Sequence, residues 1–385
     1  MWFLTVLDIL LSSLVVGPCV VGFWRGTWEY MEAYRSAFPL WWTLWVSGAL
    51  HFVFTLLRQE FAEQFRRGGL RYIIISRCYI YVFAVSCAMQ WRSTWMILED
   101  CINCYDVRYI LLVTVPSTLV LFAFKLFSNT LAPPYCIAVD FKPEDVFMFP
   151  TMFNISGTRE TWLYVLDCFF SVFVIGTLVV FVWRGFWCLL DNYLFPDRPD
   201  LSALGSLAMG YFLVFATFAT QPLMKALVCR IDGFWRILAV DIYLIFSFCG
   251  TVNVWRGVWN TLNIYFLPET PIRSYWVSHV VSFVLLIFIN SSNSILVRGV
   301  YIDAEEQGAQ CVDFPCYYLR LFFQTKRKKK LLAQLQKRHV AALARQKSEG
   351  ENCPGGGPDL DLGTVNHLMK PRASIVCPTD SQNVV

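Results

Sequence analysis

The chain has 385 residues, of which 56% are hydrophobic, 17% aromatic and only 16% charged. This apolar content exceeds that of soluble domains and is too large for one core, so part of it must face lipid. The formal net charge of +4 reflects a basic stretch near the C-terminus, which bears on membrane orientation and does not indicate nucleic-acid binding.

Eight apolar stretches are each long enough to cross a bilayer, which requires about 20 residues. They cover residues 3–23, 38–57, 72–90, 108–127, 162–182, 202–220, 237–254 and 275–297. The first resembles a signal peptide in position, but it carries Asp8 and lacks a basic leading segment. The sequence therefore predicts an all-α, polytopic membrane protein with about eight transmembrane helices.

The orientation is predicted from the basic residues that follow the last stretch. Arg320 and the run from Lys326 to Lys330 lie close behind it. The positive-inside rule places such residues in the cytoplasm. Because eight spans return the chain to the same side, we expect both termini in the cytoplasm.

A pentapeptide with tryptophan at both ends and arginine second occurs four times. The copies are Trp24-Arg25-Gly26-Thr27-Trp28, Trp91-Arg92-Ser93-Thr94-Trp95, Trp183-Arg184-Gly185-Phe186-Trp187 and Trp255-Arg256-Gly257-Val258-Trp259. Each copy follows an odd-numbered stretch, which indicates a helical hairpin that was doubled twice. We expect two parallel repeats of two hairpins each, related by an axis along the membrane normal.

Two interpretations of this motif are open. Tryptophans four residues apart share one helix face and favour the headgroup level, so the copies could form an interfacial belt in which each arginine pairs with a nearby acidic or amide residue. Alternatively, the four arginines ring an extracytoplasmic vestibule and attract anions.

Charged residues also occur at matched positions within the stretches. Asp8 and Asp167 lie 16 residues before the first tryptophan of their copies, and Arg77 and Asp241 lie 14 residues before theirs. The acids could complement helix dipoles and reach the interface, or the four charges could form a central polar site or ion path. In either case we expect a partner for Arg77 among Asp8, Asp167 and Asp241.

The remaining segments give weaker signals. Cys101 and Cys104 lie in a predicted extracytoplasmic loop, where either could form a disulfide with the other or with Cys188. Cys311 and Cys316 precede the basic run, an arrangement typical of palmitoylation and of binding to anionic lipids. Enzyme signatures are missing from the sequence, so we expect a non-enzymatic protein without a cofactor or metal.

These features divide the chain into five regions. The first repeat covers 1–127, a cytoplasmic connection 128–160 and the second repeat 161–300. A juxtamembrane basic segment, which includes an amphipathic helix over 331–346, covers 301–346, and a disordered tail covers 347–385.

The repeated motif and the closing segments Tyr193-Leu194-Phe195-Pro196 and Tyr265-Phe266-Leu267-Pro268 resemble the fuseless family of animal multi-pass membrane proteins. The resemblance covers about residues 1 to 303, and the second motif copy departs from it at Ser93. It implies a presynaptic protein of the plasma membrane that organises the active zone and places voltage-gated calcium channels there, with channel or active-zone proteins as partners. A transporter or channel for an ion or small anionic solute is the alternative, and the oligomeric state is left open.

Overall fold

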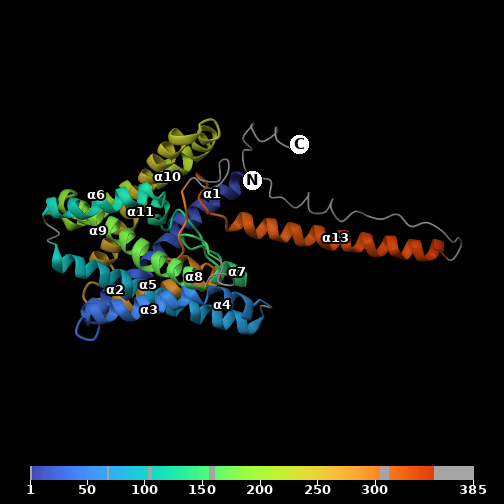
Figure 1. The fold of residues 1–385 in the computed structure, drawn as a ribbon, viewed down its shortest axis with the longest axis horizontal. Coiled ribbons are helices and arrows are strands. Elements are labelled where there is room, and N and C mark those ends of the chain that lie inside the picture. The colour runs from blue at the N-terminus through green and yellow to red at the C-terminus, as the bar shows by residue number, and fades with distance from the viewer. Residues whose placement is uncertain (1, 67–68, 103–105, 156–160, 304–311, 351–385) are drawn as a thin grey trace.

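The computed structural model describes residues 2–66, 69–102, 106–155, 161–303 and 312–350, and these residues form helices without any strand (Figure 1). In chain order the elements are α1 (Trp2–Leu11), the π-helical η1 (Ser12–Val16), α2 (Gly17–Ala33), α3 (Leu40–Leu56), α4 (Arg58–Gln64), α5 (Leu70–Cys101), α6 (Val107–Ala123), the 3-10 helix η2 (Phe127–Thr130), α7 (Pro143–Phe147), α8 (Thr161–Phe169), the π-helical η3 (Phe170–Ile175), α9 (Gly176–Tyr193), α10 (Pro199–Val228), α11 (Gly233–Tyr265), α12 (Pro271–Phe288), the 3-10 helix η4 (Ser292–Ile295) and α13 (Leu319–Gly350). The predicted all-α class is confirmed.

Six helical segments among these residues are long and apolar enough to cross a membrane. They are Phe3–Ala33, Leu70–Cys101, Thr161–Tyr193, Pro199–Val228, Gly233–Tyr265 and Pro271–Phe288. The pair α3 and α4, bent by 55°, adds a seventh if it forms one span, and α6 is a shorter apolar helix. Each of the eight predicted stretches thus contains a helix, and the chain is a polytopic helical membrane protein.

The four motif-bearing helices, α2, α5, α9 and α11, form an inner group surrounded by α3, α6, α10 and α12. Each outer helix packs mainly on the inner helix of the following hairpin: α3 on α5, α6 on α9, α10 on α11 and α12 on α2. The last contact returns to the start of the chain and closes the cycle. Two of these contacts, α3 on α5 and α10 on α11, lie within the predicted repeats, and the other two join the repeats. All four belong to one closed cycle of helices.

The glycine of the motif lies where the outer helix approaches most closely. A Cβ atom at Gly26 would stand 2.5 Å from a carbonyl oxygen of α12, and one at Gly257 would stand 2.6 Å from the backbone nitrogen of Leu207 in α10. In the second copy the Ser93 hydroxyl lies 2.6 Å from the Thr43 hydroxyl of α3. Where the other copies have glycine against the outer helix, Ser93 thus forms a side-chain hydrogen bond between the inner and the outer helix.

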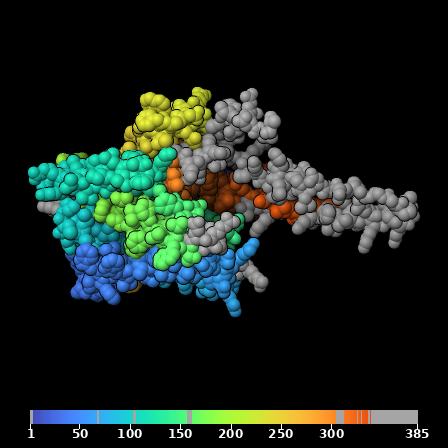
Figure 2. Space-filling model, in the orientation of Figure 1, coloured from blue at the N-terminus to red at the C-terminus, as the bar shows by residue number. Residues whose placement is uncertain are grey.

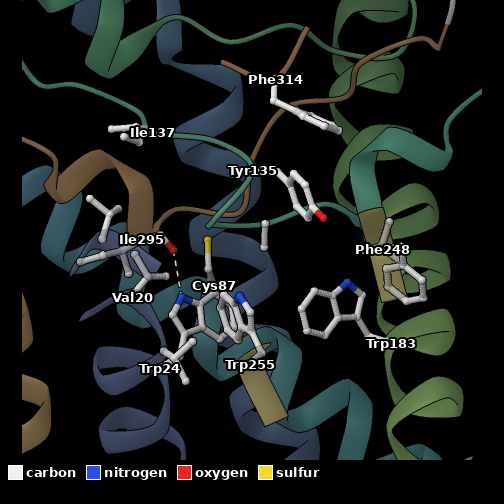
Figure 3. Packing of buried hydrophobic residues seen from close by; sticks show 14 of the residues in the cluster. Val20, Trp24, Cys87, Tyr135, Ile137, Trp183, Phe248, Trp255, Ile295 and Phe314 are labelled. Atoms are coloured by element: carbon white, nitrogen blue, oxygen red, sulfur yellow. Dashed lines mark hydrogen bonds between the residues drawn. The ribbon is translucent and has the colours of Figure 1, made fainter. Parts of the chain in front are cut away.

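The connection after α6, predicted as a cytoplasmic connection over 128–160, packs several of its side chains into the bundle. Tyr135 and Phe147 are almost inaccessible, and so are Ile295 and Phe314 from the segments that follow α12. Figure 3 shows Tyr135, Ile137 and Phe314 above the motif tryptophans. We call residues 124–155, 289–303 and 312–318 the connector segments. They enter the bundle because their aromatic and aliphatic side chains complete its core.

The C-terminal helix α13 leaves the bundle as one long helix (Figures 1 and 2). It contains the predicted amphipathic helix over 331–346 but begins earlier, at Leu319, and ends at Gly350. The remainder of the predicted tail, residues 351–385, lies outside the described residues. The end of the α10–α11 hairpin also projects from the block of helices (Figure 2).

The close approach at Gly257 gives a first test. We expect Gly257→Ala to lower the free energy of unfolding by about 1–3 kcal/mol, because the added methyl group meets backbone that cannot move alone. Gly205→Ala is the matched control, since its Cβ would meet side-chain atoms only at 3.5 Å or more. Thermal unfolding in detergent compares the two, and equal midpoints would contradict the role assigned to the motif glycine.

Candidate functional site

The first tryptophans of the four copies, which we call the deep ring, meet around the bundle axis. Trp24, Trp91, Trp183 and Trp255 contact one another in a closed cycle, with centroids 5.3 to 5.8 Å apart and interplanar angles of 70° to 80°. These are edge-to-face pairs, each worth about 0.5–1.5 kcal/mol beyond the area that it buries. The ring joins all four hairpins through one set of contacts.

The second tryptophans, the rim ring, repeat this arrangement one helical turn along. Trp28, Trp95, Trp187 and Trp259 have centroids 5.6 to 6.0 Å apart and interplanar angles of 83° to 89°. Positions i and i+4 share one helix face, so two rings can stack only because the four helices run parallel. The interfacial-belt interpretation is wrong, because these indoles face the axis and Trp24, for example, is 2% exposed.

The deep ring is anchored to the connector segments. The indole N–H groups of Trp24, Trp183 and Trp255 donate to backbone carbonyls of residues 295, 130 and 133 at 2.8 to 2.9 Å, the first of which is drawn in Figure 3. A buried indole N–H without a partner is costly. The connector segments thus satisfy these three donors and close the bundle behind the deep ring.

The two rings enclose a cavity of about 160 Å³, which Glu29 and Met96 also line. The Glu29 carboxylate accepts a hydrogen bond from Trp259 Nε1 at 2.9 Å and lies 3.5 Å from Asn263 Nδ2. Glu29 and Met96 each follow a rim-ring tryptophan in the chain, so the carboxylate lies toward the rim end of the cavity. Sequence analysis missed this role for Glu29, since the motif itself does not include it.

The four motif arginines are buried, with exposed fractions of 0 to 2%. Each is directed to the residue seven positions after the arginine of the preceding copy. Arg92 bonds Glu32 at 2.8 Å, Arg256 bonds Asp191 at 2.8 Å, Arg25 bonds Asn263 at 2.7 Å, and Arg184 interacts electrostatically with Glu99. Acidic or amide residues that follow each motif do pair with motif arginines, as predicted, but each pairs with the arginine of the next copy and not with its own. These contacts therefore join neighbouring inner helices around the bundle axis.

Hydroxyl groups of the outer helices complete two of these sites. Arg25 donates to Ser274 and Ser278 of α12 at 3.0 and 3.3 Å, and Arg256 donates to Ser202 of α10 at 2.6 Å. These guanidinium groups point away from the axis and toward the outer helices. The hypothesis of an arginine-lined vestibule is therefore wrong, because burial and these partners remove the charges from any open space.

Asp8 and Asp167, which occupy equivalent positions in the sequence, both accept hydrogen bonds from backbone N–H groups of a segment outside their own helix. Asp8 accepts from the backbone N–H of Leu319 at 2.6 Å and from Arg320 Nε at 2.8 Å, which satisfies donors at the start of α13. Asp167 accepts from the backbone N–H of Phe153 at 3.0 Å and from further groups of residues 151 and 155. Both acids are buried; Asp8 holds the start of α13, and Asp167 holds a connector segment.

Arg77 pairs with Asp140, an acid of the first connector. Its guanidinium also donates to Ser292 Oγ at 2.8 Å and to Asn290 Oδ1 at 2.9 Å. The Asp140 carboxylate in turn accepts the backbone N–H of Ser292 and that of Asn293, at the start of η4. The predicted partner set of Asp8, Asp167 and Asp241 is therefore wrong, because the partner comes from a segment that the sequence analysis treated as a loop.

Asp241 lies near two charged residues of the connector segments: Lys125 attracts its carboxylate and Asp303 repels it. Asp303 itself accepts the backbone N–H groups of Phe127 and Ser128 at the start of η2. Asp303 thus does for η2 what Asp140 does for η4. Asp8 contacts the start of α13, Arg77 and Asp167 contact connector segments, and Asp241 interacts electrostatically with Asp303 and Lys125. The four charges therefore have separate partners and do not form one central site.

The described cysteines include free thiols and disulfide-bonded residues. Cys101 is free and exposed, so neither proposed disulfide of Cys101 forms, and Cys104 lies outside the described residues. Cys188 and Cys229 each take part in a disulfide. Cys316 is free and buried beside the Pro134 carbonyl, and burial raises the pKa of its thiol. Its predicted palmitoylation is therefore wrong for this packing, and Cys311 lies outside the described residues.

Comparison with known proteins identifies the family. The sequence model described as Fuseless matches residues 3–296, which confirms the resemblance over most of the chain. No curated protein and no solved structure gives a significant match. Family membership therefore rests on the bundle region, which contains both tryptophan rings and the arginine contacts.

The arginine contacts predict a large effect for Arg92→Ala. We expect a loss of about 3 kcal/mol in the free energy of unfolding, at the lower end for a broken buried pair because Glu32 is partly exposed. Arg108→Ala is the control, since Arg108 pairs with Asp106 while remaining 88% exposed. Denaturant unfolding in detergent micelles measures both, and an Arg92→Ala midpoint equal to that of Arg108→Ala would rule out a structural ring of arginines.

The partner of Arg77 can be tested by a double-mutant cycle. We expect Arg77→Gln and Asp140→Asn to destabilise the protein singly and to show a coupling energy above about 1 kcal/mol when combined, because they share one contact. Combining Arg77→Gln with Asp241→Asn should give additive effects. Coupling of Arg77 to Asp241 instead of Asp140 would contradict the assigned pair.

Proposed function

We propose that this chain, which belongs to the Fuseless family, is a non-enzymatic integral membrane protein that organises the presynaptic active zone. In this role it supports the localisation of voltage-gated calcium channels for transmitter release. It acts by association, through surfaces held in place by a rigid bundle. The plasma membrane of the presynaptic terminal is the proposed location, with both termini in the cytoplasm.

The observation that supports association over transport is the filled core. The charges that could line an ion path have separate partners: Asp8 accepts from the backbone at the start of α13, Asp167 accepts from a connector segment, and Arg77 pairs with Asp140. Asp241 interacts electrostatically with Lys125 and Asp303 of the connector segments. The connector segments pack against the deep ring with buried aromatic side chains. A pathway would need these segments to leave the bundle, which would leave Arg77 and Asp167 without their partners.

The start of α13 provides a surface for partners. Asp8 fixes the backbone at Leu319 and the Arg320 side chain, so the basic run from Lys326 to Lys330 extends from an anchored point. At about 1.5 Å per residue, its first lysine stands roughly 10 Å from Leu319 along the helix. Such a run attracts anionic lipids, which places the helix near the inner leaflet in the proposed topology.

The proposal is tested in neurons that lack the chain. We expect calcium-channel density at active zones to fall and to recover when the full chain is expressed. A variant with glutamine at Lys326, Arg327, Lys328, Lys329 and Lys330 is expected to reach the membrane and restore less density, because it keeps the bundle but loses lipid attraction. Unchanged channel density without the chain would contradict the proposed role.

Cysteine accessibility tests the alternative of a transport pathway. In a background without reactive native cysteines, we expect Ser12→Cys and Ser171→Cys to resist a membrane-impermeant thiol reagent, since both serines are buried. Lys142→Cys and Asp197→Cys, at exposed positions, should each react when the reagent is added to the side that the position faces, and they serve as controls for the two sides. Reaction at Ser12→Cys and Ser171→Cys would favour a water-filled path through the bundle.

A further inference from the structure

We propose that the cavity between the deep and rim rings binds a quaternary ammonium group, the cationic group of choline. The cavity holds about 160 Å³, and roughly 150 Å³ suffices for a molecule of the size of benzene. A trimethylammonium group is compact enough for such a space. This inference does not depend on the role of the protein at the synapse.

The chemistry of the walls selects a cation. Eight indoles line the cavity, and the face of an indole carries the negative part of its quadrupole. Tryptophan is the side chain that attracts cations most strongly in this way, and cages of aromatic rings are the usual means of recognising quaternary ammonium groups. The edge-to-face packing keeps neighbouring indoles steeply inclined to one another, so the rings enclose the space from several directions.

Glu29 adds a charge where a cation would enter. Among the described residues that line the cavity, it is the one ionisable group with a formal charge. Glu29 interacts electrostatically with Arg25, but that guanidinium is buried behind the indoles and donates to Asn263, Ser274 and Ser278. The carboxylate, and not the arginine, is therefore the charge presented to an occupant.

The walls also discriminate between cations. A primary ammonium brings three N–H donors, each of which needs an acceptor when it leaves water, whereas the described lining offers chiefly indole surface and one carboxylate. A quaternary ammonium has no N–H donor and loses little when it is enclosed by aromatic rings. The geometry thus favours choline-type groups over lysine-like amines or hydrated metal ions.

The cavity is closed at one end. In the deep ring, Trp24, Trp183 and Trp255 are buried and hydrogen-bonded to the connector segments, and Trp91 is partly exposed. In the rim ring, three of the four indoles, those of Trp28, Trp95 and Trp187, are partly exposed. An occupant therefore enters from the rim end and stops at the deep ring. This is the shape of a binding site and not of a passage.

The same group occurs on free choline-type solutes and on the headgroup of phosphatidylcholine. The test uses the full chain in nanodiscs of phosphatidylglycerol, which carry no choline, and measures equilibrium binding of radiolabelled choline. We expect saturable binding that tetramethylammonium displaces. Dimethylbutanol, the neutral carbon isostere of choline, should compete at least about tenfold more weakly, because it lacks the charge that interacts with the indole faces.

Two variants place the binding in the cavity. Trp95→Leu should weaken choline binding between about threefold and thirtyfold, the range expected for one cation–π contact. Glu29→Gln keeps the shape and an acceptor for Trp259, and should weaken binding by a similar factor through the lost charge alone. Trp162→Leu is the control, since Trp162 is highly exposed on α8 and should leave the affinity unchanged.

The lipid composition separates the two sources. Weaker binding of free choline in phosphatidylcholine nanodiscs would show that the headgroup occupies the cavity, and equal binding would assign the site to a soluble solute. Absence of saturable choline binding in phosphatidylglycerol, equal competition by dimethylbutanol, or unchanged affinity in both Glu29→Gln and correctly folded Trp95→Leu would overturn the proposal.

Discussion

The architecture depends on the burial of four arginines inside a membrane bundle. A buried guanidinium is tolerated only when acceptors surround it, and here each motif arginine obtains its main partner from the preceding copy, as Arg92 does from Glu32 and Arg256 from Asp191. No hairpin can satisfy its own arginine in this arrangement. The four hairpins must therefore associate in a cycle, and that cycle brings both sets of tryptophans to the axis.

The same requirement explains the buried connector segments. Backbone N–H groups at membrane depth need internal partners. Asp167, Asp140 and Asp303 supply them within the connector segments, and Asp8 supplies one at the start of α13. In return, the connector carbonyls accept the indole N–H groups of the deep ring. Charges within the bundle are thus used to hold segments in place, and this use is compatible with a static bundle that acts through its surfaces.

The cavity is a consequence of packing large rings in a fourfold arrangement. Four indoles in edge-to-face contact close a ring but leave space between one ring and the next, and the connector segments close that space on one side only. A rigid aromatic pocket at the end of a membrane bundle can bind a ligand without moving any helix. A ligand there would stabilise the association of all four hairpins at once, because every copy contributes two walls.

The sequence by itself determined the helical membrane class, the fourfold motif, the matched charges and the family, because apolar length and residue spacing are local properties that a single chain displays. It did not determine what the motif faces. Whether Trp24 turns to lipid or to the axis, and whether Arg77 pairs with Asp241 or with Asp140, depends on which segments meet in space. The tertiary structure decided these points, since the outer helices pack on the next hairpin and the connector after α6 carries Asp140 and Tyr135 into the core. In the sequence, a polar residue of a connector segment cannot be distinguished from one of an exposed loop. Its burial and its partner, as for Asp140 with Arg77, are seen only in the folded structure.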